Sequence, residues 1–166
     1  MYLRLLQEDI MTKTNAMRLL DQAKIEYRIV EYEVDEDDVS GVHVAETAGE
    51  DVDKVFKTLV ARTEPGGIHV FCIPSADELD LKKAASLTKN KRVEMIHVKE
   101  LLGLTGYIRG GCSPVGMKKK YPTFIDETAI LFDTILVSGG QRGLQVEINP
   151  ETLAEFVDAE FLDLTK

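Results

Sequence analysis

The sequence predicts an α+β fold: a curved, mainly antiparallel (mixed) β-sheet or barrel-like core with surrounding helices. Two observations predict it. Runs rich in β-branched and aromatic residues occur in pairs joined by glycine-rich turns, at residues 55–73 and 133–148, which is typical of β-hairpins. Helical segments lie around these pairs and do not alternate strictly with single strands, so a purely parallel α/β sheet is not favoured.

The composition is typical of one globular domain. The 166 residues are 44% hydrophobic and 30% charged, enough for a core that needs no metal or disulfide. Lys and Arg total 20 against 29 Asp and Glu, and the net charge of -9 disfavours nonspecific nucleic-acid binding. Two cysteines suit a reducing cytoplasm. No apolar run approaches the roughly 18 residues of a membrane span.

The first residues are interpreted separately from the domain. Residues 1–10 precede a second methionine, Met11, so we interpret them as an N-terminal extension and expect a single domain over residues 11–166. Thr14 or Asn15 is expected to cap an amphipathic helix, since apolar residues follow at helical spacing.

A strand and an acidic segment are expected next. Residues 27–33 alternate as a half-buried strand does, with Tyr32 at the far end. Residues 35–38 are all acidic, and we interpret them as a solvated loop. The alternative, a metal site, lacks a histidine or second carboxylate cluster at suitable spacing.

The first hairpin is the clearest local signal. Residues 55–62 and 68–73 flank Pro65 and two glycines, which favour a tight turn. Lys57 lies within the first run, among apolar residues. Such a lysine either extends its ammonium to the surface or serves as a fixed positive charge in an apolar wall.

The remaining elements follow from capping residues and periodicity. Gly49 is expected to end one helix and Gly103 another, while Asp51 and Asp80 are expected to begin helical segments. The expected helical segments are residues 42–48, 51–54, 80–87, 97–103 and 151–159, and the further strands are residues 93–96, 122–126, 133–138 and 144–148.

One loop is unusually rich in glycine. Residues 106–116 read Gly-Tyr-Ile-Arg-Gly-Gly-Cys-Ser-Pro-Val-Gly. Exposed amides in such a loop can form an anion- or oxyanion-binding concavity. The alternative is a tight structural crossover, which composition alone favours.

The chemistry-bearing side chains do not form a familiar nucleophilic or metal constellation. Cys112 is the tempting nucleophile, but neither spacing nor motif pairs it with one of the three histidines, His43, His69 and His97. No zinc spacing and no Walker A or dinucleotide-binding motif is present. What remains is Lys57, the loop amides and several hydroxyls, which suit binding and polarising an ester: Tyr32, Thr58, Ser113 and Ser138.

Four ordered motifs carry a family resemblance. They are Phe-Lys-Thr-Leu-Val at 56–60, the glycine-rich loop at 106–116, Pro-Thr-Phe-Ile-Asp at 122–126 and Val-Ser-Gly-Gly-Gln-Arg-Gly at 137–143. In this order they resemble the YbaK/EbsC family, free-standing relatives of the prolyl-tRNA synthetase editing domain known as Cys-tRNA(Pro) and Cys-tRNA(Cys) deacylases. The resemblance covers essentially Met11 to the C-terminus.

The resemblance implies an editing-domain-like fold and a trans-editing hydrolase that cleaves the ester of a mischarged aminoacyl-tRNA, foremost Cys-tRNA(Pro). It implies substrate-assisted chemistry, in which the thiol of the bound cysteine attacks its own carbonyl and the enzyme supplies no nucleophile, cofactor or metal. The implied partners are the aminoacyl 3' end of mischarged tRNA and prolyl-tRNA synthetase, in the cytoplasm and away from membranes.

The resemblance also implies roles for individual residues. Lys57, Gly110 and Gly111 match the family's strand lysine and glycine pair, which would act on the aminoacyl end and its carbonyl. Tyr32 and Ser138 fall at positions that line the family's pocket. Gln145 stands where some relatives carry an acidic residue, and Cys112 where relatives can have an aliphatic one.

Because the net charge is acidic, binding of tRNA would need a local group of positive residues around the site, a positive rim. Each candidate could equally be a solvated surface charge. A different class of function, a noncatalytic module that binds aminoacyl-tRNA or a synthetase, stays open at this point. The rim candidates are Lys57, Lys82, Lys83, Arg109, Lys118, Lys119 and Lys120.

Overall fold

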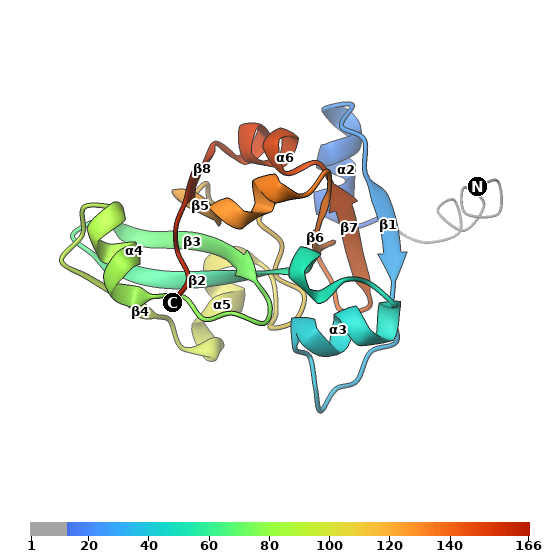
Figure 1. The fold of residues 1–166 in the computed structure, drawn as a ribbon, viewed down its shortest axis with the longest axis horizontal. Helices are drawn as coiled ribbons and strands as arrows, with labels where there is room; N and C mark the ends of the chain where they lie inside the picture. Colours follow the sequence, from blue (N-terminus) through green and yellow to red (C-terminus); the bar gives the residue numbers. More distant parts are fainter. Residues whose placement is uncertain (1–12) are drawn as a thin grey trace.

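The computed structural model describes residues 13–166, so the expected N-terminal extension at residues 1–10 lies outside the described residues. Its strands form two sheets (Figure 1). The smaller sheet is antiparallel throughout, in the order β1-β7-β6. Its strands are β1 (Arg28–Glu31), β6 (Ile135–Ser138) and β7 (Leu144–Ile148), and β6 with β7 is the second predicted hairpin.

The larger sheet is mixed, in the order β4-β2-β3-β5-β8. β2 pairs antiparallel with β3 and β4, whereas β5 lies parallel to both β3 and β8. These pairings confirm the α+β prediction with a mixed, mainly antiparallel core, and the two sheets do not close into a barrel. The strands are β2 (Phe56–Glu64), β3 (Gly67–Pro74), β4 (Arg92–Met95), β5 (Thr123–Asp126) and β8 (Ala159–Leu162).

The helices begin at side chains that accept hydrogen bonds from their free amides, as the sequence predicts. Thr14 accepts from the amide of Met17, and Asp80 accepts from the amides of Lys82 and Lys83. Within residues 13–166, no helix has the length and apolar character needed to cross a membrane. The helices are α2 (Asn15–Gln22), α3 (Gly41–Ala48), η1 (Val52–Lys54), α4 (Leu81–Leu87), α5 (Val98–Thr105), η2 (Glu127–Leu131) and α6 (Pro150–Val157).

Three sequence expectations are corrected. β1 is not half-buried by alternation, because Ile29 packs into the core with α2 while its neighbour Val30 packs against α3, so both faces are covered. α5 runs two residues past Gly103, to Thr105, and Gly106 caps it. The last helix stops at Val157 because Asp158 takes a left-handed conformation, after which the chain adds β8 to the sheet edge.

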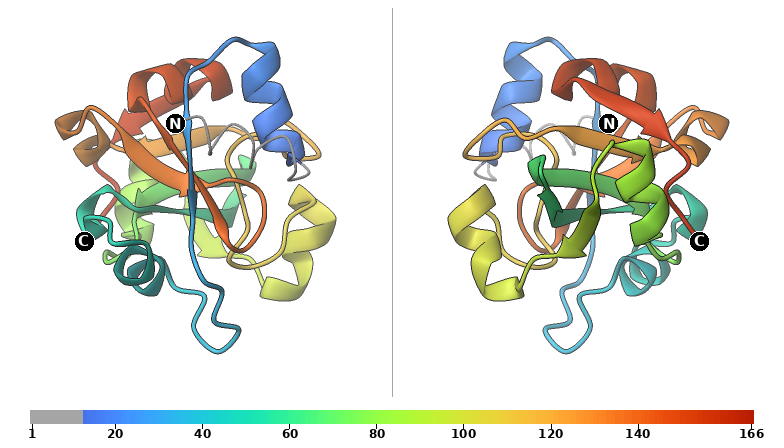
Figure 2. Two further views of the ribbon diagram at one scale, coloured as in Figure 1. Left: turned by 90° about the vertical axis from the view of Figure 1, so that its right-hand side faces the viewer. Right: turned by 90° about the vertical axis from the view of Figure 1, so that its left-hand side faces the viewer.

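The two sheets meet at β2 and then diverge. A bridge between Val55 and Leu136 joins β2 to β6, and β4 covers β2 only from Ala61 to Glu64. Between these contacts the outer edge of β2 has no partner strand among the described residues. Figure 2 shows α3 and α5 on opposite sides of this half of the molecule. The fold therefore leaves a gap along β2 with a helix at each side.

Candidate active site

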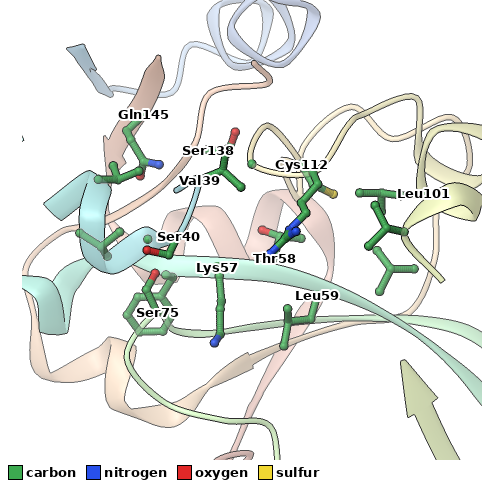
Figure 3. Close-up of a pocket in the computed structure, with 18 of the residues that line it drawn as sticks. Val39, Ser40, Lys57, Thr58, Leu59, Ser75, Leu101, Cys112, Ser138 and Gln145 are labelled. Carbon is green, nitrogen blue, oxygen red and sulfur yellow. The ribbon is translucent and has the colours of Figure 1, made fainter. Parts of the chain in front are cut away.

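A cavity of about 380 Å³ lies along the uncovered edge of β2 (Figure 3). It is bounded by the loop before α3 on one side and by α5 with the glycine-rich loop on the other. Among residues 13–166, no histidine, aspartate or glutamate lines it. The lining residues are Val39, Ser40, Gly41, Val44, Val55, Phe56, Lys57, Thr58, Leu59, Val60, Ser75, Met95, Ile96, Val98, Leu101, Arg109, Gly110, Cys112, Ser138 and Gln145.

Backbone groups of β2 face this cavity. The carbonyl of Val60 accepts from the amide of Ile96 at 3.3 Å, and the carbonyl of Glu64 accepts from Lys91 at 2.7 Å, both on the β4 side. Backbone groups alternate in direction along a strand, so Thr58 also presents its amide and carbonyl to this side. Because β4 does not reach Thr58, the strand edge offers a ligand one donor and one acceptor.

Lys57 is half-buried on β2 and lines the cavity. Its ammonium has no hydrogen bond or ion pair within residues 13–166. Burial lowers the pKa of Lys57, and the charges of Asp77 and Glu78 partly oppose this shift. A cation held in a wall without an internal partner is available to an incoming carbonyl or phosphate.

The two predicted glycines occupy different environments. Gly110 lines the cavity, whereas Gly111 is buried behind it and is not among the lining residues. The amide of Gly111 donates to the carbonyl of Ile108 at 3.0 Å. In this conformation Gly111 therefore shapes the loop, and its amide is not available to a ligand.

Arg142 ties the segments around the cavity together. Its Nε donates to the carbonyl of Arg109 at 2.8 Å, and its guanidinium also pairs with Glu36. These contacts join the glycine-rich loop, the turn between β6 and β7, and the acidic loop after β1. Glu36 of the acidic run therefore helps to hold Arg142 in place. No cluster that could hold a metal ion occurs among the described residues.

The predicted hydroxyls divide into two pairs. Thr58 and Ser138 line the cavity, and Ser138 Oγ accepts from the amide of Gly140 at 3.1 Å, which leaves its own proton free to donate. Ser113 does not line it, and its hydroxyl accepts from the amide of Val115 at 3.0 Å within the loop. Tyr32 is half-buried just after β1 and is also outside the lining.

The cysteines are poorly suited to nucleophilic attack. Burial raises the pKa of Cys112 to about 12, and it likewise raises the pKa of Cys72 to about 12. Since the thiolate is the nucleophilic form, both stay as unreactive thiols at neutral pH. Cys112 lines the cavity, but none of His43, His69 and His97 does.

Only part of the predicted positive rim reaches the cavity. Lys57 and Arg109 line it. Lys83 instead pairs with Asp163 at 3.1 Å, and Lys119 and Lys120 border a second, smaller cavity of about 220 Å³ beside α6.

Sequence reasoning missed two lining serines. Ser40 caps α3 by accepting from the amide of His43 at 3.2 Å, and a serine before a helical run is a signal that could have identified it. Ser75 follows β3, and nothing in its sequence surroundings marks it. Ser75 Oγ and Gln145 Oε1 are the buried side-chain oxygens of the described chain that have no hydrogen-bond partner.

Comparison with known proteins agrees with this geometry. Residues 38–156 match the family described as the aminoacyl-tRNA editing domain. The chain is also 46% identical, over 153 residues, to EbsC of Enterococcus faecalis (strain ATCC 700802 / V583), whose name assigns it as a Cys-tRNA(Pro)/Cys-tRNA(Cys) deacylase. That match covers 92% of this chain and 93% of the relative.

Solved structures share the fold. One, described as a trans-editing enzyme for prolyl tRNA synthetase, has a TM-score of 0.79 at 24% identity and covers 94% of this chain and 99% of its own. Another, the hypothetical protein APE2540, has a TM-score of 0.83 at 20% identity over 92% of this chain and 100% of its own. At these identities the likeness supports the architecture alone.

Proposed function

The chain belongs to the aminoacyl-tRNA editing domain family, and we propose that it acts in trans on mischarged tRNA, with Cys-tRNA(Pro) as its main substrate. Membership makes it an enzyme, a deacylase that hydrolyses the ester between an amino acid and tRNA. The name of its E. faecalis relative, which joins cysteine to tRNA(Pro) and tRNA(Cys), supports the choice of substrate.

The observation that carries the proposal is the half-buried, unpaired ammonium of Lys57 beside the open edge of β2. We place the ester along this edge, where Lys57, Thr58 and Gly110 all line the cavity. Donors held in a partly dry site stabilise negative charge that develops on a carbonyl oxygen. This arrangement supports acyl transfer from an ester by hydrogen-bond donors and a positive charge, with no protein side chain serving as a metal ligand.

The reaction we propose uses the substrate's own thiol. The cysteinyl sulfur gives up its proton and attacks the ester carbonyl, so that a carbon–sulfur bond forms and the carbon–oxygen bond to ribose breaks. The ribose oxygen takes a proton, and water later opens the resulting thiolactone to free cysteine. Holding the thiol and carbonyl together makes the attack effectively unimolecular.

Two features support a route without an enzyme nucleophile. The pKa of Cys112 is raised by burial to about 12, which keeps it protonated. Within the part of the chain that the structure describes, no histidine or carboxylate lines the cavity to activate a hydroxyl or a water. The reactive sulfur is then best supplied by the substrate.

We also propose that the protein works beside prolyl-tRNA synthetase in the cytoplasm, where tRNA is charged. A pocket built for proline discriminates weakly against another small amino acid, so a second, hydrolytic step supplies the missing specificity. The net charge of -9 predicts weak affinity for the tRNA body, and delivery from the synthetase would compensate.

The test is hydrolysis of defined aminoacyl-tRNAs by the purified full chain. We expect rapid deacylation of Cys-tRNA(Pro) and none of Ala-tRNA(Pro) or Pro-tRNA(Pro), whose amino acids lack the thiol. Binding of Cys-tRNA(Pro) without release of cysteine would contradict the proposal and assign a binding role instead. Replacing the cysteine with S-methylcysteine on the same tRNA should abolish turnover if the thiol is the nucleophile.

A further inference from the structure

Two oxygens inside the cavity lack the hydrogen bonds that buried polar groups normally make. Gln145 is 5% exposed and Ser75 is 8% exposed, yet Gln145 Oε1 and Ser75 Oγ have no partner among the described residues. Buried oxygens without partners are uncommon in folded proteins, so two that line one cavity call for a specific explanation.

Both oxygens lie toward the α3 side of the cavity. Ser75 sits directly against the first residue of α3, since a Cβ on Gly41 would lie 1.9 Å from Ser75 Oγ. Gln145 is paired across the sheet with Val30, and Val30 packs against Ala45 of α3. Figure 3 shows Gln145 and Ser75 on this side with Ser40 between them, and Leu101 on the opposite side.

The opposite side of the cavity is open and apolar. Met95, the last residue of β4, is 42% exposed and Val98, the first residue of α5, is 62% exposed, and both line the cavity. A tRNA continues away from its aminoacyl group, so the nucleotide must leave through the open side. The amino acid, which is the end of the substrate, then occupies the α3 side, where Gln145 and Ser75 are buried.

We infer that the α3 side of the cavity binds the α-amino group of the substrate, with Gln145 Oε1 as the principal acceptor and Ser75 Oγ as the second. This inference rests on the proposed function. An aminoacyl ester carries few donors, namely the α-amino hydrogens and, in cysteine, a weakly donating thiol that is consumed in the attack. An amide oxygen that only accepts and a hydroxyl oxygen that can accept, both without partners among the described residues, match an amino group.

The charges around the cavity agree with a neutral acceptor at residue 145. Of the described residues, Lys57 and Arg109 are the charged ones that line it, and no carboxylate does. Nearby cations favour the uncharged form of an amine. An amide oxygen accepts a hydrogen bond from the amine in either form, so Gln145 does not depend on the amine carrying charge.

The test measures binding of two analogues that the enzyme cannot hydrolyse. One is 3'-deoxyadenosine carrying cysteine through a 3'-amide, and the other carries 3-mercaptopropanoate, which keeps the thiol and lacks the amino group. We expect wild type to bind the cysteinyl analogue at least about 10-fold more tightly. In Gln145→Leu this preference should fall to within about 2-fold, through weaker binding of the cysteinyl analogue alone.

Further variants make the result decisive. Ser75→Ala should reduce the preference partially, and Gln145→Glu should retain it because an acceptor oxygen remains. Gln22→Leu, on the exposed end of α2, should match wild type. Three outcomes overturn the inference. They are that Gln145→Leu weakens the binding of both analogues equally, that it leaves the preference unchanged, or that wild type shows no preference. Because binding is measured without turnover, these results stand apart from whether Cys-tRNA(Pro) is hydrolysed.

Discussion

Gly111 and Gln141 meet backbone to backbone, because a Cβ on Gly111 would lie 3.0 Å from the Cα of Gln141. This contact presses the glycine-rich loop onto the turn between β6 and β7, two segments that both contribute to the wall behind the cavity. The glycine at 111 is therefore required by close packing, while Gly110 beside it faces the cavity.

Gly111→Ala should weaken both the fold and the activity. The added methyl group has backbone as its neighbour, so the turn must move, and the free energy of unfolding should fall by about 1–3 kcal/mol. We expect deacylation to fall at least about 10-fold, since small displacements at a site are costly. Urea unfolding and single-turnover deacylation measure the two effects.

Gly103→Ala is the matched control for that change. Gly103 lies within α5, and a Cβ there would meet nothing within 4 Å. This substitution should raise stability by roughly 0.5–1 kcal/mol because alanine favours a helix. If both alanine variants behave alike, the packing explanation for Gly111 is wrong.

Lys57→Met should abolish most deacylation without destabilising the protein. Burial lowers the pKa of Lys57, so the folded state carries a cation it does not stabilise. Below this lowered pKa the penalty is fully present, and stability rises with pH as the folded lysine loses its proton before the unfolded one does. Thermal unfolding at pH 7 should show an unchanged or higher Tm.

Lys54→Met is the matched control, because it removes a lysine charge outside the cavity. Lys54 precedes β2 and pairs with Glu147 at 3.1 Å, outside the cavity lining. This variant should lose stability and keep its deacylase rate. A Lys57→Met variant that unfolds as readily as Lys54→Met would show that Lys57 has a structural role instead.

Glu147→Gln should make stability less dependent on acid pH. Burial raises the pKa of Glu147, but hydrogen bonds from Arg28, Lys54 and Thr134 outweigh this, and the pKa falls to about 2. A lowered carboxylate pKa stabilises the fold above its unfolded value of about 4.5, and the effect is lost as pH falls toward 2.

At pH 7 Glu147→Gln should lower the free energy of unfolding by an amount on the order of 1–2 kcal/mol. This is less than the free energy that corresponds to the full pKa shift of Glu147, because solvent screens the exposed Arg28. The difference from wild type should shrink steadily between pH 4.5 and pH 2 in urea titrations. Glu155→Gln, at an exposed position on α6, should leave the free energy of unfolding at pH 7 unchanged. A difference that stays constant with pH would exclude the ionic explanation.

Cys112→Ala should keep most of the deacylase activity. The thiol lines the cavity, but its pKa of about 12 leaves almost no thiolate at neutral pH. We expect at least about a third of the wild-type rate, with the remainder lost through repacking of a nearly buried side chain. A loss of about 1,000-fold at unchanged Tm would instead identify Cys112 as a nucleophile.

Local chemistry made much of the fold predictable from sequence. The turn at Pro65 and the glycine-rich turn after Ser138 indicate the two hairpins, and Thr14 and Asp80 mark helix starts, because such signals act within a few residues. The β8 strand was missed, since pairing with β5 depends on residues far away in the chain.

The α+β class, the hairpins and the motifs that carry Lys57 and Gly110 could be predicted from the sequence. The tertiary structure was needed to show that β4 leaves the edge of β2 uncovered at Thr58, that the Gly111 amide is taken by Ile108, and that Ser75 lies against Gly41. Turns and caps arise from neighbouring residues, whereas burial and unmet hydrogen bonds arise from how distant segments pack, and no local pattern encodes them.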